Sequence, residues 1–287
     1  METPKATPLP YYLGGPQWQA PAWHSQLPAG GPPLARYAKV FNTVEGNTTF
    51  YASPSRAQSE QWRQQVPDDF RFLLKLPKAL THEHFLHGVE QQFQAFLRLV
   101  EPLRDVLGPM LLQLPAGFGP GHLDQLWRFL DTAPVDLDWT VEVRHPAFFA
   151  KGEAERALNR GLMERKLARV VLDSRALFSA FPDNPVTIDA QRKKPRVPVH
   201  LLPSEGAPVI RFIGHPDLDA NRPFLAPWVE RVARWIETGI RPYVFMHMPD
   251  NNHAIELACL WTELLQEHLP ELGPLPVTTS TPQIGLF

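Results

Sequence analysis

Residues 110–114 (MLLQL) and 139–143 (WTVEV) are two short apolar runs, and residues 123–130 (LDQLWRFL) between them have apolar side chains at helical spacing. Short apolar runs are typical of strands that are buried on both faces, as in a parallel sheet. A strand, a helix and a second strand in this order form a βαβ unit, in which the two strands are parallel. This stretch therefore predicts an α/β fold.

The same alternation extends along the chain. Strands are expected at 11–13, 40–50, 70–76, 110–114, 139–143, 168–172, 209–212 and 243–246, and helices at 56–65, 90–107, 123–130, 153–166, 228–237 and 255–267. Eight strands alternating with helices in a chain of 287 residues predict a single closed (β/α)8 TIM barrel, whose typical length is about 250 residues. An open doubly wound sheet is the alternative, but no Gly-x-Gly-x-x-Gly sequence follows the first strand.

Three segments lie outside this alternation. We expect a flexible N-terminal tail at 1–10, the barrel domain at 11–269, and a proline-rich C-terminal tail at 270–287. Between the sixth and seventh strands, residues 174–208 are expected to form one long loop that contains the basic cluster 192–196 (RKKPR). A loop of this length in a compact domain is functional or mobile, whereas a short run of charges is usually a solvated surface.

Composition excludes several classes of protein. A net charge of −2 argues against a broad surface for duplex nucleic acid, because such surfaces carry a basic excess. The single cysteine, Cys259, lies in an apolar run, as a buried and inert thiol would. No apolar stretch is long enough to span a membrane and the N-terminus has no apolar segment, so we expect a cytoplasmic protein.

Polar residues lie at or just beyond the end of nearly every predicted strand. In a (β/α)8 barrel these ends meet at one mouth, where active sites are built. Because charged side chains are costly to bury unless they pair or face a ligand, their convergence favours a site over a purely structural network. The residues expected to line this mouth are Glu45, Asn47, Lys75, His82, Gln113, Glu142, Arg144, Asp173, Arg211 and His247. Glu45, Asn47 and Thr49 are expected to share one face of the second strand, since side chains alternate.

The types of these residues predict an anion-binding pocket. Lys75, Arg144 and Arg211 are expected to bind a phosphate or carboxylate group, on a small ligand or on a nucleic acid. The candidate catalytic residues, which exchange protons, are Glu45, Glu142, Asp173 and His82. The remaining ligand-binding candidates are Asn47, Gln113 and His247. The pattern leaves binding and catalysis open, with hydrolysis or phosphodiester cleavage as the expected reaction class for an enzyme.

Three other functions remain as alternatives. A metal-dependent phosphodiesterase would use the histidines, among them those of 81–87 (THEHFLH), but three cations at the mouth oppose a metal ion, so neither a metal site nor a cofactor is predicted. A glycoside hydrolase would use Glu45 and Glu142 as its two carboxylates. A non-catalytic module would bind single-stranded nucleic acid or a protein through the basic cluster 192–196.

The same strand ends carry a family resemblance. The segments 44–51 (VEGNTTFY), 72–75 (FLLK), 107–109 (LGP), 113–115 (QLP), 141–145 (VEVRH) and 210–214 (IRFIG) occur in this order, with Thr81 and His82 after the second of them. Together, over about 11–265, the chain resembles the YecE-like family of unknown function, DUF72. The resemblance implies a (β/α)8 barrel and supplies no established activity, although some members have been likened to barrel-type apurinic endonucleases on fold alone. Many members have asparagine near the position of His247.

Overall fold

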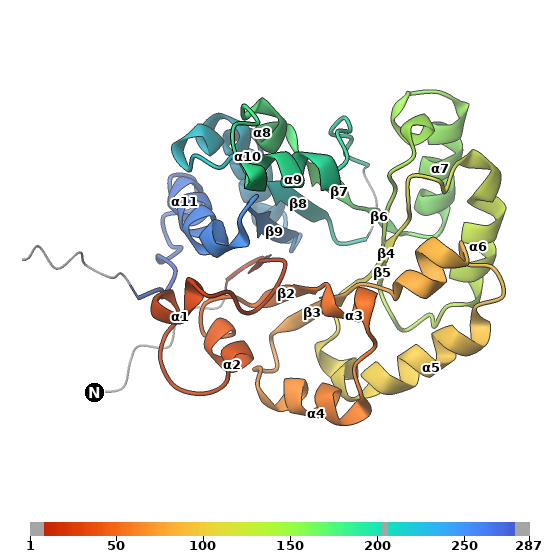
Figure 1. The fold of residues 1–287 in the computed structure, drawn as a ribbon, viewed down its shortest axis with the longest axis horizontal. Helices are drawn as coiled ribbons and strands as arrows, with labels where there is room; N and C mark the ends of the chain where they lie inside the picture. The colour runs from red at the N-terminus through yellow and green to blue at the C-terminus, as the bar shows by residue number, and fades with distance from the viewer. Residues whose placement is uncertain (1–8, 203–205, 279–287) are drawn as a thin grey trace, which may run out of the picture.

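The computed structural model describes residues 9–202 and 206–278, in which short parallel strands alternate with helices (Figure 1). The strands are β1 (Tyr12–Gly14), β2 (Thr43–Gly46), β3 (Arg71–Leu74), β4 (Met110–Gln113), β5 (Trp139–Glu142), β6 (Ala168–Arg169), β7 (Val171–Asp173), β8 (Val209–Ile213) and β9 (Tyr243–His247). Each predicted run overlaps a strand, and the sixth run, 168–172, overlaps two. The predicted α/β fold is therefore confirmed.

The strands pair in three parallel sheets. Their orders are β1-β9-β8-β7, β2-β3 and β4-β5-β6. Single contacts lie between the sheet edges: Glu45 N donates to Gly15 O at 3.0 Å, and an isolated bridge pairs Lys75 with Leu111. The strand of the sixth run changes partner at Val170, since β6 pairs with β5 and β7 pairs with β8. The pairing thus consists of three sheets and not of one uninterrupted ring.

The helices include all six predicted segments. They are α1 (Trp23–Gln26), α2 (Pro33–Tyr37), α3 (Thr48–Tyr51), α4 (Arg56–Gln64), α5 (Glu90–Val100), α6 (Leu123–Thr132), α7 (Glu153–Glu164), α8 (Arg175–Ser179), α9 (Pro185–Lys193), α10 (Arg222–Glu237) and α11 (Ala254–Gln266). The start of α4 is fixed by a capping box, in which the Ser55 side chain accepts from Gln58 N and the Gln58 side chain accepts from Ser55 N. The predicted helix 90–107 ends at Val100 and continues as a 3-10 helix, Glu101–Val106.

Two local predictions are wrong. The segment 174–208 is not one long loop, because it contains α8 and α9; Asn184 caps α9 by accepting from Thr187 N, and Pro185 occupies its first turn. The second strand ends at Gly46, so Asn47 and Thr49 do not alternate with Glu45 along it. Thr49 Oγ1 lies 2.8 Å from Gly46 O and 2.5 Å from Lys75 O, and its one hydroxyl hydrogen is shared between these two carbonyl acceptors, which stabilises the turn into α3.

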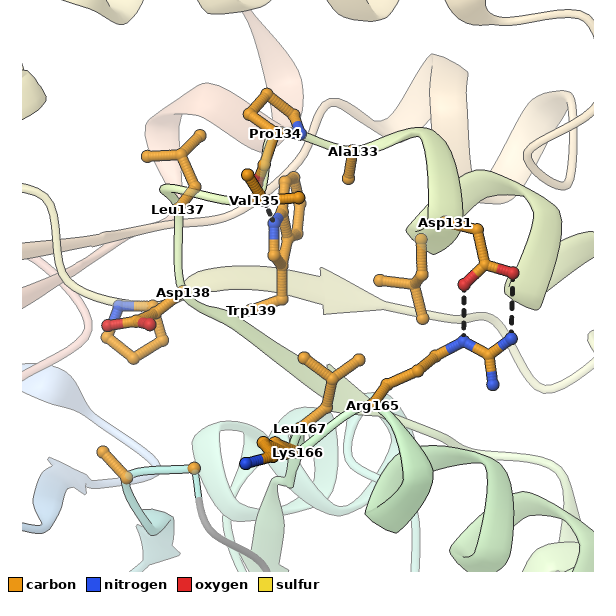
Figure 2. Close-up of a pocket in the computed structure, with 14 residues that line it drawn as sticks. Asp131, Ala133, Pro134, Val135, Leu137, Asp138, Trp139, Arg165, Lys166 and Leu167 are labelled. Carbon is orange, nitrogen blue, oxygen red and sulfur yellow. Dashed lines mark hydrogen bonds and ion pairs between the residues drawn. The ribbon is translucent and has the colours of Figure 1, made fainter.

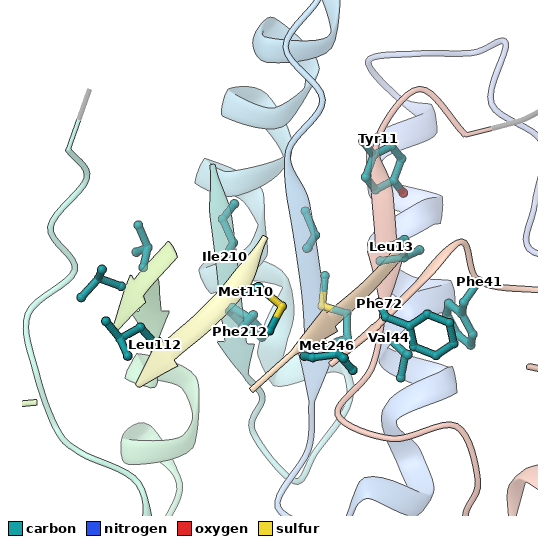
Figure 3. Close-up of a cluster of buried hydrophobic side chains, with 14 of the residues drawn as sticks. Tyr11, Leu13, Phe41, Val44, Phe72, Met110, Leu112, Ile210, Phe212 and Met246 are labelled. Carbon is teal, nitrogen blue, oxygen red and sulfur yellow. The ribbon is translucent and has the colours of Figure 1, made fainter. Parts of the chain in front are cut away.

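Alternate side chains along the strands belong to two separate hydrophobic clusters. One cluster lies between strands and helices and includes Leu13, Val44 and Phe72 (Figure 3). The other consists mainly of strand residues, namely Tyr12, Leu73, Leu111, Val170, Val209, Tyr243 and Phe245. Since successive side chains of a strand point to opposite faces, the second cluster marks the face of each strand that is turned away from the helices. We call this the inner face.

The predicted tails are only partly described. Residues 1–8 and 279–287 lie outside the described residues. In the segment 270–278, Leu272 and Leu275 are buried in the larger hydrophobic cluster, and Thr278 N donates to Gln26 O at 2.8 Å.

Within the described residues, the structure contains no helix that is both long and apolar enough to cross a membrane.

Candidate functional site

Polar side chains on the inner face gather at the carboxyl ends of the strands. Strand alternation places them there: Glu45 is on the opposite face from Val44, and Arg211 shares its face with Val209. The predicted site residues on this face, all buried, are Glu45, Lys75, Gln113, Glu142, Arg211 and His247. The apolar inner cluster lies below them, toward the amino ends of the strands. Six of the ten predicted residues therefore share this face.

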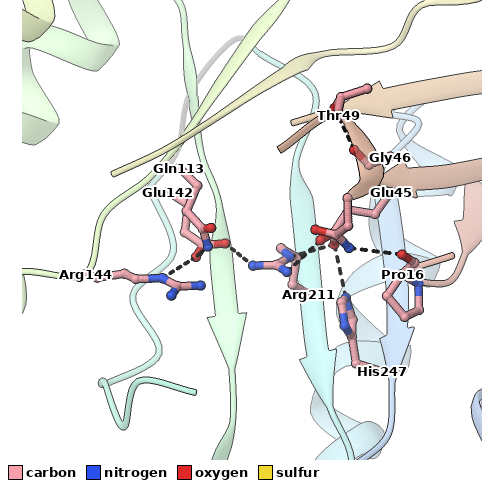
Figure 4. A network of polar contacts seen from close by, with 10 residues as sticks. Pro16, Glu45, Gly46, Thr49, Gln113, Glu142, Arg144, Arg211 and His247 are labelled. Atoms are coloured by element: carbon pink, nitrogen blue, oxygen red, sulfur yellow. Dashed lines mark hydrogen bonds and ion pairs between the residues drawn. The ribbon is translucent and has the colours of Figure 1, made fainter. Parts of the chain in front are cut away.

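Arg211 lies between two carboxylates at the centre of this group (Figure 4). Its Nε and Nη2 donate to the two oxygens of Glu45, each at 2.7 Å. Its Nη1 donates to Oε2 of Glu142. The Arg211 side chain is only 3% exposed and the two carboxylates are no more than 1% exposed. Removing charged side chains from water is costly unless every charge is paired. Here the guanidinium of Arg211 pairs with both carboxylates.

Three more residues complete the contacts of the two carboxylates. His247 Nε2 lies 3.1 Å from Oε2 of Glu45. Gln113 Nε2 donates to Oε1 of Glu142 at 2.5 Å, and Arg144 Nε donates to the same oxygen at 3.0 Å. The Arg144 side chain is partly exposed. We call Glu45, Arg211, Glu142, Gln113 and His247 the buried frame, with Arg144 at its exposed end.

The frame is fixed in one protonation state at neutral pH. Burial raises the pKa of Glu142, but Arg211, Arg144 and Lys75 outweigh it and hold this pKa at about 2. In the same way, Arg211 and His247 outweigh burial and hold the pKa of Glu45 well below its usual range. Burial lowers the pKa of His247 to about 4, although Glu45 opposes the shift. Both carboxylates are therefore ionised and the imidazole is neutral, so the frame supplies fixed charge and does not exchange protons near pH 7.

Lys75 follows β3 and is buried beside the frame without joining it. Within residues 9–202 and 206–278 its Nζ forms no hydrogen bond or ion pair, and it lies 3.6 Å from the centroid of the Phe50 ring. Burial lowers the pKa of Lys75 to about 7; Glu142 and Glu45 oppose this shift, while Arg211 and Arg144 add to it. Lys75 is thus a buried amine that gains and loses a proton at neutral pH.

His82 contacts the same aromatic ring. Its ring packs edge-on against Phe50, with centroids 4.9 Å apart, and its Nδ1 lies 2.8 Å from Thr81 Oγ1. Burial and the charge of Lys75 lower the pKa of His82 to about 4. The imidazole is therefore neutral at pH 7.

Lys194 is a residue of this region that the sequence interpretation missed. Arg192 and Lys193 are exposed and pair with Asp189, as expected of a solvated charge run. Lys194, directly after α9, is half-buried, and burial lowers the pKa of its amine to about 8. Arg211 and Arg144 contribute to the same shift, while Glu45 and Glu142 oppose it. Lys194 is therefore within electrostatic reach of the frame, and nothing in the run RKKPR distinguishes it from Lys193.

Two predicted site residues lie elsewhere. Asp173 is buried, but its carboxylate accepts from Arg175 Nη2 at 2.7 Å and from Trp228 Nε1 at 2.8 Å. It is two residues from Val171, which packs in the helix-facing cluster, so alternation turns Asp173 toward α10. Asn47 is half-buried in the turn after β2 and donates to Pro16 O at 3.0 Å. The structure does not bring either side chain into the frame.

The other candidate groups give no metal cluster. In the part of the chain that the structure describes, no three His, Cys, Asp or Glu side chains are grouped so that they could hold a metal ion. In the segment 81–87, His84 and His87 are exposed, while His82 is half-buried against Phe50. Cys259 is half-buried, and burial raises its thiol pKa to about 11, so this thiol is protonated at neutral pH.

A cavity of about 680 Å³ lies at the opposite end of the strands. Its lining includes Trp139, the first residue of β5, and Asp131 and Arg165, which form an ion pair with Arg165 Nε donating at 2.7 Å (Figure 2). A second cavity of about 780 Å³ is lined by Tyr12 and Tyr243, the first residues of their strands. Both cavities are separate from the buried frame.

Comparison with known proteins identifies relatives along nearly the whole chain. A model of the family described as "Protein of unknown function DUF72" matches residues 12–282. The chain is 46% identical over 265 residues to the UPF0759 protein YecE of Escherichia coli strain K12, which covers 92% of this chain and 96% of that protein. The protein of the same name in Escherichia coli O157:H7 is 45% identical over the same lengths.

Solved structures support the fold. A DUF72 family protein from Enterococcus faecalis V583 superposes with a TM-score of 0.63 at 18% identity, over 92% of this chain and 98% of that one. A DUF72 family protein from Thermotoga maritima MSB8 gives a TM-score of 0.59 at 22% identity, over 91% and 99% of the two chains. At these identities the likeness shows a shared α/β fold.

Proposed function

Because the chain belongs to the DUF72 family of proteins of unknown function, we propose a function from the chemistry of the site: the protein binds a small ligand that carries a phosphate or carboxylate group, at the carboxyl ends of its strands. The observation that supports this most strongly is the excess of positive charge there. Four cationic side chains, Lys75, Arg144, Lys194 and Arg211, surround only two carboxylates. An anion would compensate this excess.

The four cationic side chains have different roles. Arg211 is occupied by Glu45 and Glu142, so it holds the frame in place and does not contact the ligand. Arg144 uses Nε for Glu142, while its two Nη groups donate no hydrogen bond to any described residue. These two groups form the planar fork that matches a phosphate or carboxylate. Arg144 and Lys194 therefore bind the anionic group, and Lys75 faces it from the end of β3.

The proposal includes a closed (β/α)8 arrangement of the strands. The backbone hydrogen bond between Glu45 N and Gly15 O and the bridge between Lys75 and Leu111 lie between the separate sheets. The inner cluster contains residues from β1, β3, β4, β8 and β9, as the packed interior of a barrel does. Closure would bring the carboxyl end of every strand to one mouth, which is the arrangement that a shared anion site requires.

Binding of inorganic phosphate tests this function, with sulfate and citrate as further probes. Titration calorimetry on the wild type is compared with Arg144→Gln and Lys194→Gln. Each variant removes one charge-assisted contact worth roughly 1.5 to 3 kcal/mol, so we expect phosphate binding to weaken by about 10- to 100-fold. Lys193→Gln is the matched control, because Lys193 is the exposed neighbour that pairs with Asp189, and it should leave binding unchanged.

Two results would contradict the proposal. One is the absence of binding for phosphate, sulfate and citrate in the wild type. The other is equal binding by the wild type, Arg144→Gln and Lys194→Gln. If Lys193→Gln weakened binding as much as Lys194→Gln, the anion would be held on the exposed end of α9 and not beside the frame.

A further inference from the structure

We infer that Lys75 is a nucleophile, whose amine forms an imine with the carbonyl carbon of the bound anion; this inference rests on the proposed function and names its substrate class. The substrate is an aldehyde or ketone that also carries a phosphate or carboxylate group. The inference begins with the position of the amine. Lys75 lies directly after β3, at the strand ends where the anion is proposed to bind, and its side chain is almost wholly buried.

Among the residues that the structure describes, Lys75 differs from the other buried cations in having no ionic partner. Arg211 pairs with two carboxylates, and Arg169 pairs with Glu155 at 3.2 Å. Among the described residues, the contact made by Lys75 Nζ is instead the face of the Phe50 ring. A structural lysine buried at this depth would be expected to pair with a carboxylate. An unpaired amine at the end of a strand is the arrangement of a reactive lysine.

The surroundings keep this amine reactive at neutral pH. Only the unprotonated amine has the lone pair that attacks a carbonyl, and an ordinary lysine is almost fully protonated at pH 7. Burial of Lys75, with a smaller contribution from Arg211 and Arg144, lowers its pKa to about 7 against the opposing charges of Glu142 and Glu45. A much larger fraction of Lys75 than of an ordinary lysine therefore carries the neutral amine at that pH. His82 is within electrostatic reach of this amine, and because its own pKa is lowered to about 4 it is neutral and adds no positive charge.

The reaction balances without a further reagent. The Nζ lone pair attacks the carbonyl carbon, the carbon–nitrogen bond forms, and the electron pair of the carbon–oxygen double bond moves to oxygen. That oxygen takes up a proton while nitrogen loses one. The hydroxyl group then takes up a proton from solvent and leaves as water while the nitrogen lone pair forms the carbon–nitrogen double bond. Nitrogen returns its second proton to solvent, so that one amine and one carbonyl give one imine and one water.

Pyridoxal 5′-phosphate is the probe, because it joins an aldehyde to a phosphate. The protein is incubated with it at pH 7, reduced with borohydride, and analysed by intact mass and peptide mapping. We expect about one pyridoxyl group per chain, on Lys75, and at least tenfold less of it in Lys75→Arg, which keeps the charge but removes the nucleophile. Lys78→Arg is the matched control, since Lys78 is exposed and pairs with Glu83. Lys75→Met serves as a second variant should Lys75→Arg fail to fold.

The outcomes separate this inference from the proposed function. Pyridoxal without its phosphate should label Lys75 more weakly, and inorganic phosphate should protect it. Labelling spread over exposed lysines, or labelling unchanged in both Lys75 variants, overturns the imine. If phosphate binds as proposed and Lys75 stays unlabelled, the imine alone is wrong. If Lys75 is labelled equally by both aldehydes and phosphate gives no protection, the nucleophile stands and the anion site is wrong.

Discussion

Replacing Arg211 with methionine is expected to lower the free energy of unfolding by about 3 to 5 kcal/mol. The substitution removes the guanidinium that Glu45 and Glu142 share, and it leaves two buried carboxylates without their principal partner. Equilibrium unfolding in urea measures the change. Arg63→Met is the matched control, because Arg63 also contacts two carboxylates, Asp68 and Asp105, but at the surface. There the expected cost is at most about 1 kcal/mol.

The pH dependence of the same variant distinguishes lost pairing from lost packing. In the wild type the pKa of Glu142 is lowered to about 2, so its stabilising contribution is complete above the ordinary glutamate pKa and is lost as pH falls toward 2. In Arg211→Met the buried carboxylates should have raised pKa values, so that variant should instead gain stability as pH falls from 7 to 5. Adding Glu45→Gln and Glu142→Gln should recover much of the loss. A loss below about 1 kcal/mol, or no change in the pH slope, would show that the frame is not held by this pairing.

Replacing Lys75 with methionine is expected to stabilise the protein at pH 7, by an amount on the order of 3 kcal/mol. The folded-state pKa of Lys75 is about 7, below the ordinary value of 10.5. Between these two pH values the unfolded chain binds more protons than the folded protein, so wild-type stability rises with pH across this window. Methionine resembles the neutral side chain in size and carries no charge, so it removes the penalty.

The difference in the free energy of unfolding between Lys75→Met and the wild type should therefore shrink as pH rises from 7 toward 10.5. Chemical unfolding of the wild type and Lys75→Met at several pH values measures it, with Lys78→Met as the exposed control. A Lys75→Met variant that is less stable than the wild type at pH 7, or a difference that does not change with pH, would mean that Lys75 is an ordinary structural cation. The predicted gain in the free energy of unfolding would also show that the buried amine of Lys75 destabilises the wild type. Functional residues often carry such a cost in stability.

The part of the site on the inner face could be predicted from the sequence, because strand alternation alone determines which side chains point to that face. Glu45, Gln113, Glu142, Arg211 and His247 each fall at the inward register of a short buried strand, so finding the strands was enough to bring them together. The family resemblance pointed to the same segments. The strand boundaries were less accessible, since Thr48, Thr49 and Phe50 are residue types common in strands but belong to α3.

The remaining parts of the site depend on contacts that single-sequence patterns do not contain. Asp173 was expected at the mouth, but counting outward from Val171 places it on the helix-facing side, where Arg175 and Trp228 contact it. The alternation rule would have found this had it been applied to that strand. Lys194 could not be predicted as a site residue, because only the packing of α9 distinguishes its half-buried amine from the exposed Lys193. The occupation of Arg211 by two carboxylates likewise depends on partners 166 and 69 positions away in the sequence.

The excess positive charge beside the frame is tested most directly by proton uptake on anion binding. Phosphate is titrated into the protein at pH 8 by calorimetry in two buffers of different ionisation enthalpy, with sulfate alongside because it carries no proton to exchange. Lys194 has a pKa of about 8, so a bound anion should raise this pKa and draw protons from the buffer. We predict a net uptake on binding of either anion, much reduced in Lys194→Gln and unchanged in Lys193→Gln. Binding without proton uptake, or uptake unaffected by Lys194→Gln, would contradict an anion site that includes Lys194.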